Sequence, residues 1–230
     1  MNTTALIIMA KEPRIGSTKT RLCPPLTFED AAQLYEALLL DTIEMASTLE
    51  GIDLAIAVTP PESTPYFEQI APNTILVPVD CENIGQCLSK VLNHLLKMGY
   101  VKAMALNSDG PSLPTVYIQQ AVTGLEEHDL VFGPSEDGGY YLVGLKEMSN
   151  QIFTDIEWST ARVLSQTLAT CENLNMKVDL LPPWYDVDTA ADIERLREEL
   201  TTLPGNALGH TRALMESSFG KRAQEESGHD

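Results

Sequence analysis

Hydrophobic residues gather in short runs that alternate with amphipathic segments along most of the chain. Segments such as 28–49 and 84–99 repeat their apolar positions with the period of a helix. The runs between them have the length of buried strands, and they lie at 4–10, 52–59, 74–79, 101–107, 129–133, 140–145 and 177–182. Because strands that alternate with helices pair in parallel, the pattern predicts an α/β fold in which helices flank one wound, mostly parallel, Rossmann-like sheet.

One pair of predicted strands breaks this alternation. The runs 129–133 and 140–145 have no helical segment between them and are joined by a short Asp-Gly-Gly turn. A turn of this composition between two apolar runs is typical of a β-hairpin. The sheet is therefore predicted to be mixed, with one antiparallel pair.

The core pattern ends near residue 200. A chain of 230 residues with 43% hydrophobic content can bury a sizeable core, and we expect one domain over 1–200. The stretch 201–230 offers few core positions and many small polar residues. It is predicted to be an appendage without chemistry, partly disordered over its last dozen residues.

Net charge limits the partners that the surface can bind. The chain carries a formal charge of −18 and a sequence pI near 4.5. Such a surface repels duplex DNA and anionic lipid, so a nucleic-acid partner is not expected. A small anion could still bind at a local cationic site.

The apolar run near the N-terminus and the cysteines and histidines give no sign of a membrane span, a zinc site or a disulfide framework. Residues 5–10 are apolar, but the run is too short and wrongly flanked for a signal peptide or a membrane span, so we expect a cytoplasmic protein. The four cysteines form no Cys-x-x-Cys pair and the four histidines are scattered, so neither a zinc site nor a disulfide framework is expected. The oligomeric state stays open.

Positive charge is concentrated just after the first predicted strand. Four of the 15 Lys and Arg residues fall within eleven positions: Lys11, Arg14, Lys19 and Arg21. Arginine can bind phosphate through two parallel hydrogen bonds, and lysine can act as a movable point charge. Ligands of wound sheets lie beyond the carboxyl ends of the strands, so the cluster predicts a phosphate site. The alternative is a solvated basic loop.

A short turn lies between these cations, and its backbone N–H groups would suit a phosphate. The turn is not a Walker P-loop, because a P-loop needs a glycine directly before its lysine and here Lys19 follows Thr18. The predicted phosphate-binding residues are Lys11, Gly16, Ser17, Thr18, Lys19 and Arg21.

Carboxylates are predicted at the same edge of the sheet. Asp109 follows the strand 101–107, and the spacing of Asp186 and Asp188 directs both to one side of an extended segment. Mg²⁺ or Mn²⁺ binds through one or two carboxylates together with phosphate oxygens. Asp109 and Asp188 are therefore the predicted ligands, and Asp186 is expected to orient Asp188. The alternatives are that Asp109 only completes a turn and that Asp188 or Thr189 caps the next helix.

The Asp137 turn is the candidate acceptor site. Gly138 and Gly139 would let an acceptor approach the backbone, and Asp137 could accept a hydrogen bond or a proton from its hydroxyl. The alternative is that the glycines serve only the hairpin. Trp158 is a further candidate for the acceptor wall, although a tryptophan in such a position is more often part of the core.

Gly85 lies in the first turn of the predicted helix 84–99, where Asn83 and Gln86 resemble a capping box. A glycine inside a helix costs roughly 0.5–1 kcal/mol relative to alanine. This cost suggests that a flat group, such as a nucleobase, packs against Gly85.

Six motifs in order resemble those of a bacterial family of proposed glycosyltransferases associated with radical-SAM and selenium-domain genes. The motifs are KEPRIGSTKTRL, NIGQCL, NSDGPSLP, GPSEDGGYYLVGL, WST and YDVDT, and the resemblance covers about residues 4–200. It implies a nucleotide-diphospho-sugar transferase fold of the GT-A type. It also implies similarity to the guanylyltransferases that build molybdenum-cofactor and deazaflavin-cofactor dinucleotides.

The resemblance implies roles for residues already singled out. Lys19 and Arg21 would bind the diphosphate, and Gly85 would lie near the base. Asp109 and Asp188 would hold the metal.

The leading hypothesis is a metal-dependent transferase that takes a nucleotide-diphosphate sugar and a small-molecule acceptor. Lys19 and Arg21 would stabilise the departing diphosphate, while Asp137 would position or deprotonate the acceptor hydroxyl. The alternative is a nucleotidyltransferase that joins an NTP to a phosphorylated acceptor and releases pyrophosphate. A third hypothesis is a nucleotide-binding module without turnover. The superfamily includes both reaction types, so the fold by itself does not choose between them.

Overall fold

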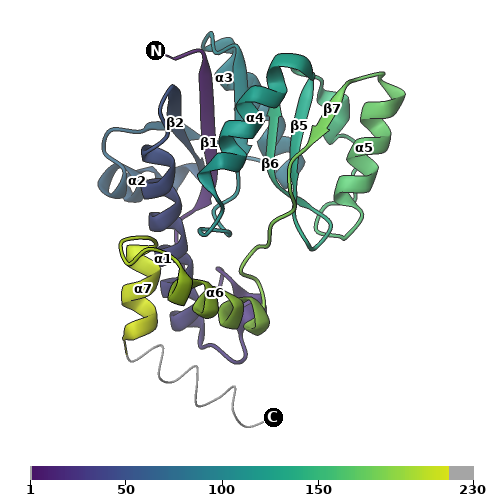
Figure 1. Ribbon diagram of the computed structural model, residues 1–230. Coiled ribbons are helices and arrows are strands. Elements are labelled where there is room, and N and C mark those ends of the chain that lie inside the picture. Colours follow the sequence, from purple (N-terminus) through teal and green to yellow (C-terminus); the bar gives the residue numbers. More distant parts are fainter. Residues whose placement is uncertain (1, 218–230) are drawn as a thin grey trace.

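The computed structural model describes residues 2–217, and its centre is one sheet of seven strands. The strands are β1 (Thr4–Lys11), β2 (Ile52–Thr59), β3 (Ile75–Pro78), β4 (Lys102–Leu106), β5 (Leu130–Pro134), β6 (Tyr140–Leu145) and β7 (Val178–Leu180). Their order across the sheet is β3-β2-β1-β4-β6-β5-β7 (Figure 1). All seven predicted strands are therefore confirmed.

The sheet is mixed, as predicted. β6 runs antiparallel to both of its neighbours, β4 and β5, while the other pairs are parallel. The β5–β6 hairpin turns through Gly138, whose φ of +92° lies in the region that favours glycine. A Cβ at Gly138 would also lie 2.3 Å from the carbonyl oxygen of Ala161. Backbone geometry alone thus explains this glycine.

Helices cover both faces of the sheet (Figure 1). They are α1 (Phe28–Ser47), α2 (Thr64–Ile70), α3 (Ile84–Lys97), α4 (Thr115–Glu127), α5 (Val163–Asn173), α6 (Ala190–Thr202) and α7 (Gly209–Glu216). α1, α2 and α4 pack on one face, and α3 and α5 pack on the other. Alternate β1 residues supply both cores: Leu6 and Ile8 point to the first face, and Ala5 and Ile7 to the second.

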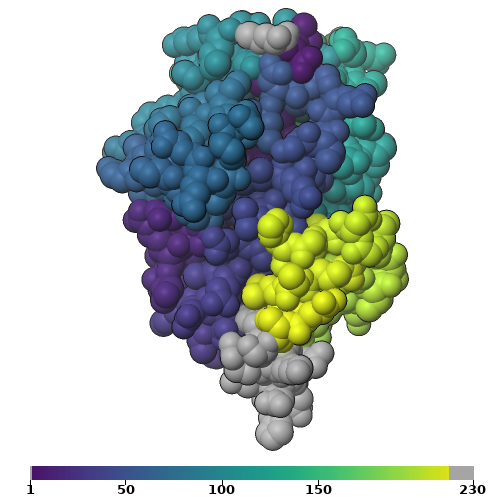
Figure 2. All heavy atoms as spheres, turned by 90° about the vertical axis from the view of Figure 1, so that its left-hand side faces the viewer, coloured from purple at the N-terminus to yellow at the C-terminus, as the bar shows by residue number. Residues whose placement is uncertain are grey.

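The C-terminal region is packed rather than appended. α6 and α7 join a third apolar cluster with α1. Figure 2 shows α7, in yellow, lying beside the violet-blue α1. Residues 209–216, part of the stretch 201–230 that was expected to be an appendage, thus pack on the same body, and the domain boundary near residue 200 stays a prediction. The last dozen residues lie outside the described part of the chain.

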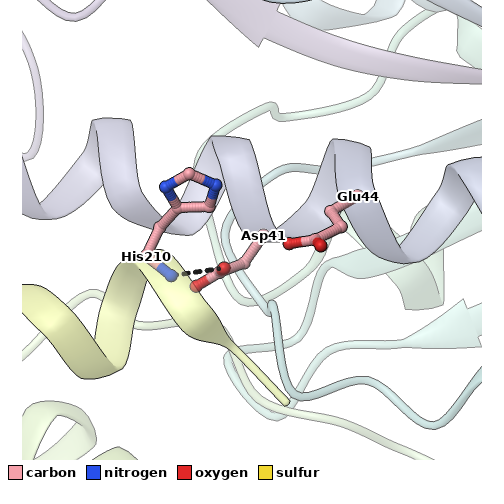
Figure 3. A group of neighbouring side chains, drawn as sticks. All are labelled: Asp41, Glu44 and His210. Atoms are coloured by element: carbon pink, nitrogen blue, oxygen red, sulfur yellow. Dashed lines mark hydrogen bonds between the residues drawn. The ribbon is translucent and has the colours of Figure 1, made fainter. Parts of the chain in front are cut away.

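A carboxylate of α1 holds the start of α7. Asp41 is buried, and its two oxygens accept hydrogen bonds from the backbone N–H groups of His210 at 2.9 Å and Thr211 at 2.8 Å. Helix N-termini leave such groups without partners, and α7 has no side-chain cap of its own. Figure 3 shows Asp41 beside Glu44 and His210, a group whose ligand atoms lie within 4.8 Å of one another. The hydrogen bonds of Asp41 identify its role here as an anchor for α7.

Between residues 2 and 217, every helix is too short or too polar to cross a lipid bilayer.

Candidate active site

Two adjoining cavities open at the carboxyl end of the central strands. The first has a volume of about 550 Å³ and lies between the turn after β1, the loop before α3 and the loop after β4. The second, of about 670 Å³, lies between β4, β6, the hairpin turn and the segment before α5. They share a border made of Met9, Arg21, Ile84, Asn107 and Asp188.

The turn after β1 forms one wall of the first cavity. Thr18 accepts a hydrogen bond from the backbone N–H of Arg14 at 3.0 Å, and Gly16 adopts a φ of +78°. Ser17, Thr18 and Lys11 line the cavity, as predicted, whereas Gly16 shapes the turn from outside the cavity wall. The residues predicted to bind phosphate thus lie at one cavity, and their binding of phosphate stays a prediction.

Arg14 points away from the cavity. Its guanidinium lies 2.6 Å from Glu12 and 3.2 Å from the Ser63 hydroxyl. Glu12 accepts hydrogen bonds from Arg14 and from Ser63. Both lower the pKa of Glu12, and the bond from Arg14 has the larger effect. Only three of the four clustered cations, Lys11, Lys19 and Arg21, thus line the first cavity.

Lys19 connects the two predicted metal ligands. Its Nζ lies 2.8 Å from Oδ1 of Asp109 and 2.7 Å from Oδ1 of Asp188, and its side chain is only 6% exposed. Burial disfavours the charged ammonium, but the two carboxylates outweigh this effect and raise the pKa of Lys19. Arg21, which is 70% exposed, lies 3.1 Å from the second oxygen of Asp188.

The carboxylates of Asp109 and Asp188 converge on one cationic point, where a divalent cation could also be held by both. The side chains of Asp109 and Asp188 are each about one-third exposed, so water and substrate oxygens can reach them. Mg²⁺ or Mn²⁺ would suit this donor set, since both prefer carboxylate and water ligands. Nζ of Lys19 stands at the point of convergence, so a cation bound there requires this lysine to move.

The neighbour of Asp188, rather than Asp188 itself, caps the next helix. Thr189 is the N-cap of α6: its hydroxyl accepts a hydrogen bond from the N–H of Asp192, whose carboxylate bonds back to the N–H of Thr189. This capping box leaves the carboxylate of Asp188 directed at Lys19.

Asp186 belongs to a polar cluster that the sequence did not predict. Its oxygens accept hydrogen bonds from Asn107 at 2.7 Å and from Ser135 at 2.9 Å. Burial has the largest effect on the pKa of Asp186, and the charge of Asp109 has the second largest; together they raise this pKa to about 7. The two hydrogen bonds act in the opposite direction. These hydrogen bonds join Asp186 to the ends of β4 and β5, and its expected role in orienting Asp188 stays a prediction. No local signal marked Asn107 or Ser135, because their common partner is distant in the sequence.

The second cavity combines aromatic rings with polar groups. The rings of Tyr140, Tyr141 and Trp158 line it, and so do Asp137 and Gly139. The N–H of Gly139 donates to Asp137 at 3.0 Å, and this bond fixes the carboxylate at the cavity wall. Gly138, also predicted for acceptor binding, does not line the cavity.

Gly85 is pressed against the indole of Trp158. A Cβ at this position would lie 2.5 Å from the indole ring, so any larger residue would collide with it. The flat group that explains the glycine is thus the side chain of Trp158. Contact between Gly85 and a nucleobase stays a prediction, and its neighbour Ile84 is one of the residues that border both cavities.

A disulfide forms part of the first cavity. Cys81 and Cys87 are bonded, with Cα atoms 5.4 Å apart, and both line the cavity. We expected no disulfide framework, and this single pair was not predicted. Their spacing matches no motif, and the turn of the chain into α3 brings them together.

The sequence of residues 42–160 matches the family described as "Uncharacterized protein conserved in bacteria (DUF2064)". The chain belongs to this family. A search of curated proteins found no match.

Solved structures share the whole fold. A crystal structure from Desulfovibrio desulfuricans G20, named as a proposed nucleotide-diphospho-sugar transferase, is 26% identical with a TM-score of 0.84, and the alignment covers 99% of this chain and 96% of that one. A cytidylyltransferase from Leptospira borgpetersenii is 11% identical with a TM-score of 0.59, covering 99% and 95%. A CMP:2-keto-3-deoxy-manno-octonic acid synthetase complexed with CTP is 14% identical with a TM-score of 0.55, covering 86% and 99%.

These neighbours confirm the fold and the superfamily that the motifs indicated. A single mixed sheet flanked by helices is common to nucleotide-diphospho-sugar transferases and cytidylyltransferases. The comparisons therefore support a transferase.

Proposed function

We propose that the protein transfers a sugar from a nucleotide-diphosphate donor to a small acceptor. The observation that supports this reaction most strongly is the pairing of a cation-lined cavity with an aromatic cavity that shares its border. The first cavity suits an anionic donor, and the second suits an acceptor that approaches the donor sugar at the border.

The first cavity would bind the diphosphate of the donor. Arg21 is the exposed cation at the border of the two cavities, so it can contact the phosphates without leaving a buried position. Lys11 and the backbone of the turn would add further donors. Lys19 would reach the phosphates after release from one of its carboxylate partners.

Asp109 and Asp188 would hold the Mg²⁺ or Mn²⁺ ion. When bound, such a cation supplies positive charge that offsets the negative charge developing on the leaving diphosphate. The observation that supports this role is that both carboxylates lie within 2.8 Å of one lysine ammonium.

Asp137 is the candidate group for the acceptor hydroxyl. In the transfer, the acceptor oxygen forms a bond to the anomeric carbon as the bond from that carbon to the phosphate oxygen breaks. The electron pair of the broken bond stays on the nucleoside diphosphate, and the acceptor proton passes to Asp137 or to water. Gly139 holds the carboxylate in position through its N–H group.

Nucleotidyl transfer is the second candidate. Cytidylyltransferases share the fold, and the same cations would suit the triphosphate of an NTP. In that reaction the acceptor would attack the α-phosphorus, and pyrophosphate would leave.

The identity of the leaving product separates the two reactions. Purified protein with Mn²⁺ would be incubated with labelled nucleotide sugars and, separately, with NTPs plus candidate acceptors. We expect release of a nucleoside diphosphate from nucleotide sugars. Release of pyrophosphate from an NTP would instead favour nucleotidyl transfer. Tight nucleotide binding without either product, across a broad acceptor panel, would favour the module without turnover.

Two arginine variants test the donor cavity. Arg21→Gln should weaken the binding of a nucleoside diphosphate roughly three- to tenfold at low salt, because it removes an exposed charge facing the phosphates. Arg14→Gln is the matched control, since Arg14 belongs to the same turn but contacts Glu12. Equal losses in both variants, measured by calorimetry, would show only a general charge effect.

A further inference from the structure

The two cavities differ in the balance of the charges that line them. The first has three cationic side chains, from Lys11, Lys19 and Arg21, and three carboxyl groups, from Glu82, Asp109 and Asp188. The second has a single cation, Arg21, together with the carboxyl groups of Asp137, Asp186 and Asp188. Carboxyl groups thus outnumber cations in the second cavity and not in the first.

Cations near the second cavity already have acidic partners. Arg21 is paired with Asp188 at the border. Arg162 follows the cavity-lining Ala161, but it is 64% exposed and forms an ion pair with Glu157. Among the described residues, each cation at or beside this cavity therefore has an acidic partner.

The apolar part of the cavity suits the face of a ring. The indole of Trp158 lies 6.4 Å from the ring of Tyr140 at an angle of 78°, and both side chains line the wall. Leu88 and Val143 extend this apolar surface. Ser159 and Thr160 add hydroxyl groups beside it. Apolar walls with a few convergent polar groups are typical of sites for small neutral molecules.

We propose that the second cavity binds an acceptor that carries hydroxyl groups but no phosphate or carboxylate. The acceptor would lay an apolar face on Trp158 and direct its hydroxyl groups at Asp137 and Asp186. This assignment rests on the proposed function, and it names the chemical class of the acceptor. It also separates the protein from transferases whose acceptors are sugar phosphates.

Like-charge repulsion is the physical basis of the preference for a neutral acceptor over a phosphorylated one. A phosphate monoester carries a charge of about −1.5 to −2 at neutral pH. Placing it beside Asp137 and the partly ionised Asp186 disfavours binding, and opposed like charges are a known means of rejecting a competing ligand. We expect the phosphorylated member of a matched pair to bind at least roughly tenfold more weakly.

Tryptophan fluorescence measures this preference without any turnover. The chain has two tryptophans, so Trp184→Phe leaves Trp158 as the single reporter in the cavity wall. Trp184 packs edge-on against Tyr117, and its indole N–H is buried without a hydrogen-bond partner, so phenylalanine should be accepted. The probes are glucose against glucose 6-phosphate and glycerol against glycerol 3-phosphate, each with a saturating nucleoside diphosphate.

The titrations decide the proposal in either direction. Stronger quenching by the neutral member of a pair supports it. Equal or tighter binding of the phosphorylated member, or quenching by inorganic phosphate alone, would overturn it. Absence of quenching by every neutral probe at high concentration would also count against it.

A charge variant tests the cause of the preference. Asp137→Asn keeps an oxygen that can accept from Gly139 but removes one negative charge from the wall. The preference for the neutral probe should shrink several-fold. Glu136→Gln is the matched control, because Glu136 is the adjacent acid but pairs with Arg195 outside the cavity. An unchanged preference in Asp137→Asn would remove Asp137 from the argument.

Product analysis separates failure of this proposal from failure of the proposed function. If neutral acceptors are rejected while the sugar is transferred to phosphorylated acceptors, with release of a nucleoside diphosphate, the proposed acceptor class is wrong and the proposed glycosyl transfer stands. If nucleotide sugars are neither bound nor consumed, the proposed function is wrong. The fluorescence titrations still decide the charge preference of the cavity in that case.

Discussion

Nζ of Lys19 lies 2.7 Å from Oδ1 of Asp188, although 169 positions separate the two residues in the chain. Asp109 contacts the same ammonium, at 2.8 Å. The N-terminal turn, the end of β4 and the segment before α6 therefore meet at one buried charge. This contact makes Lys19 structural as well as a candidate for donor binding.

Loss of Lys19 should destabilise the fold. Lys19→Met would leave Asp109 and Asp188 facing each other without a positive charge between them. Because both carboxylates are partly exposed, we expect a loss of about 1–3 kcal/mol rather than the larger cost of a fully buried pair. Urea unfolding measures it, and the triple variant with Asp109→Asn and Asp188→Asn should recover part of the loss. No recovery would mean that lost packing, rather than unpaired charge, explains the effect.

Mn²⁺ should substitute for the missing ammonium. In Lys19→Met the two carboxylates are free to hold a cation, so added Mn²⁺ should raise the melting temperature of this variant more than that of the wild type. A scan of melting temperature against Mn²⁺ concentration checks this prediction. Equal shifts in both proteins would argue against convergence of Asp109 and Asp188 on one ion.

Metal and nucleotide should bind cooperatively. Mg²⁺ and Mn²⁺ take part of their coordination from substrate phosphates, so Asp109→Asn and Asp188→Asn should each abolish the metal-dependent part of nucleotide binding. Calorimetric titration of Mn²⁺ with and without nucleoside diphosphate measures the coupling. Glu82→Gln is the matched control, because Glu82 lines the first cavity but bonds to Gln86. Full coupling in Asp188→Asn would show that it is not a ligand.

Gly85→Ala should test the indole contact. The new Cβ would lie 2.5 Å from the ring of Trp158, so we expect a loss of about 1–3 kcal/mol from overpacking. In a Trp158→Leu background the same substitution should cost less, because the smaller side chain leaves room. Thermal unfolding of the two single variants and the double variant gives the coupling. If the two substitutions have strictly additive effects on stability, the cost of alanine at position 85 does not arise from contact with Trp158.

Thiol counting should reveal the disulfide of the first cavity. Under denaturing, non-reducing conditions the purified chain should show the thiols of Cys23 and Cys171 alone, and after reduction all four cysteines should react. Cys81→Ser should free Cys87 and add one reactive thiol before reduction. Four reactive thiols before reduction would mean that Cys81 and Cys87 are not joined in solution.

Sequence alone determined the elements, because the signals that define them are local. The run at 52–59 became β2 and the run at 140–145 became β6 with the predicted bounds. Asn83 caps α3 by accepting the N–H of Gln86, as its position before an apolar helix indicated. Each of these features depends on the alternation of side chains or on hydrogen bonds within a few residues.

The candidate site was predictable where residues follow directly on strands. Lys11, Ser17, Thr18 and Asp109 line the first cavity because parallel strands bring their carboxyl ends to one edge of the sheet. The positions of these residues in the fold thus follow from the order of strands and helices.

Tertiary structure decided how the side chains are partnered. The sequence marked Lys19 as a loop cation, but two distant carboxylates and burial determine its state. The glycine at position 85 suggested contact with a flat group, and the indole of Trp158, 73 positions away, is the flat group that the structure places against it. Docking of α7 likewise depends on Asp41 of α1. Such contacts join residues far apart in the chain, so no local pattern contains them, and only the packing of elements against one another fixes which charge or ring each residue meets.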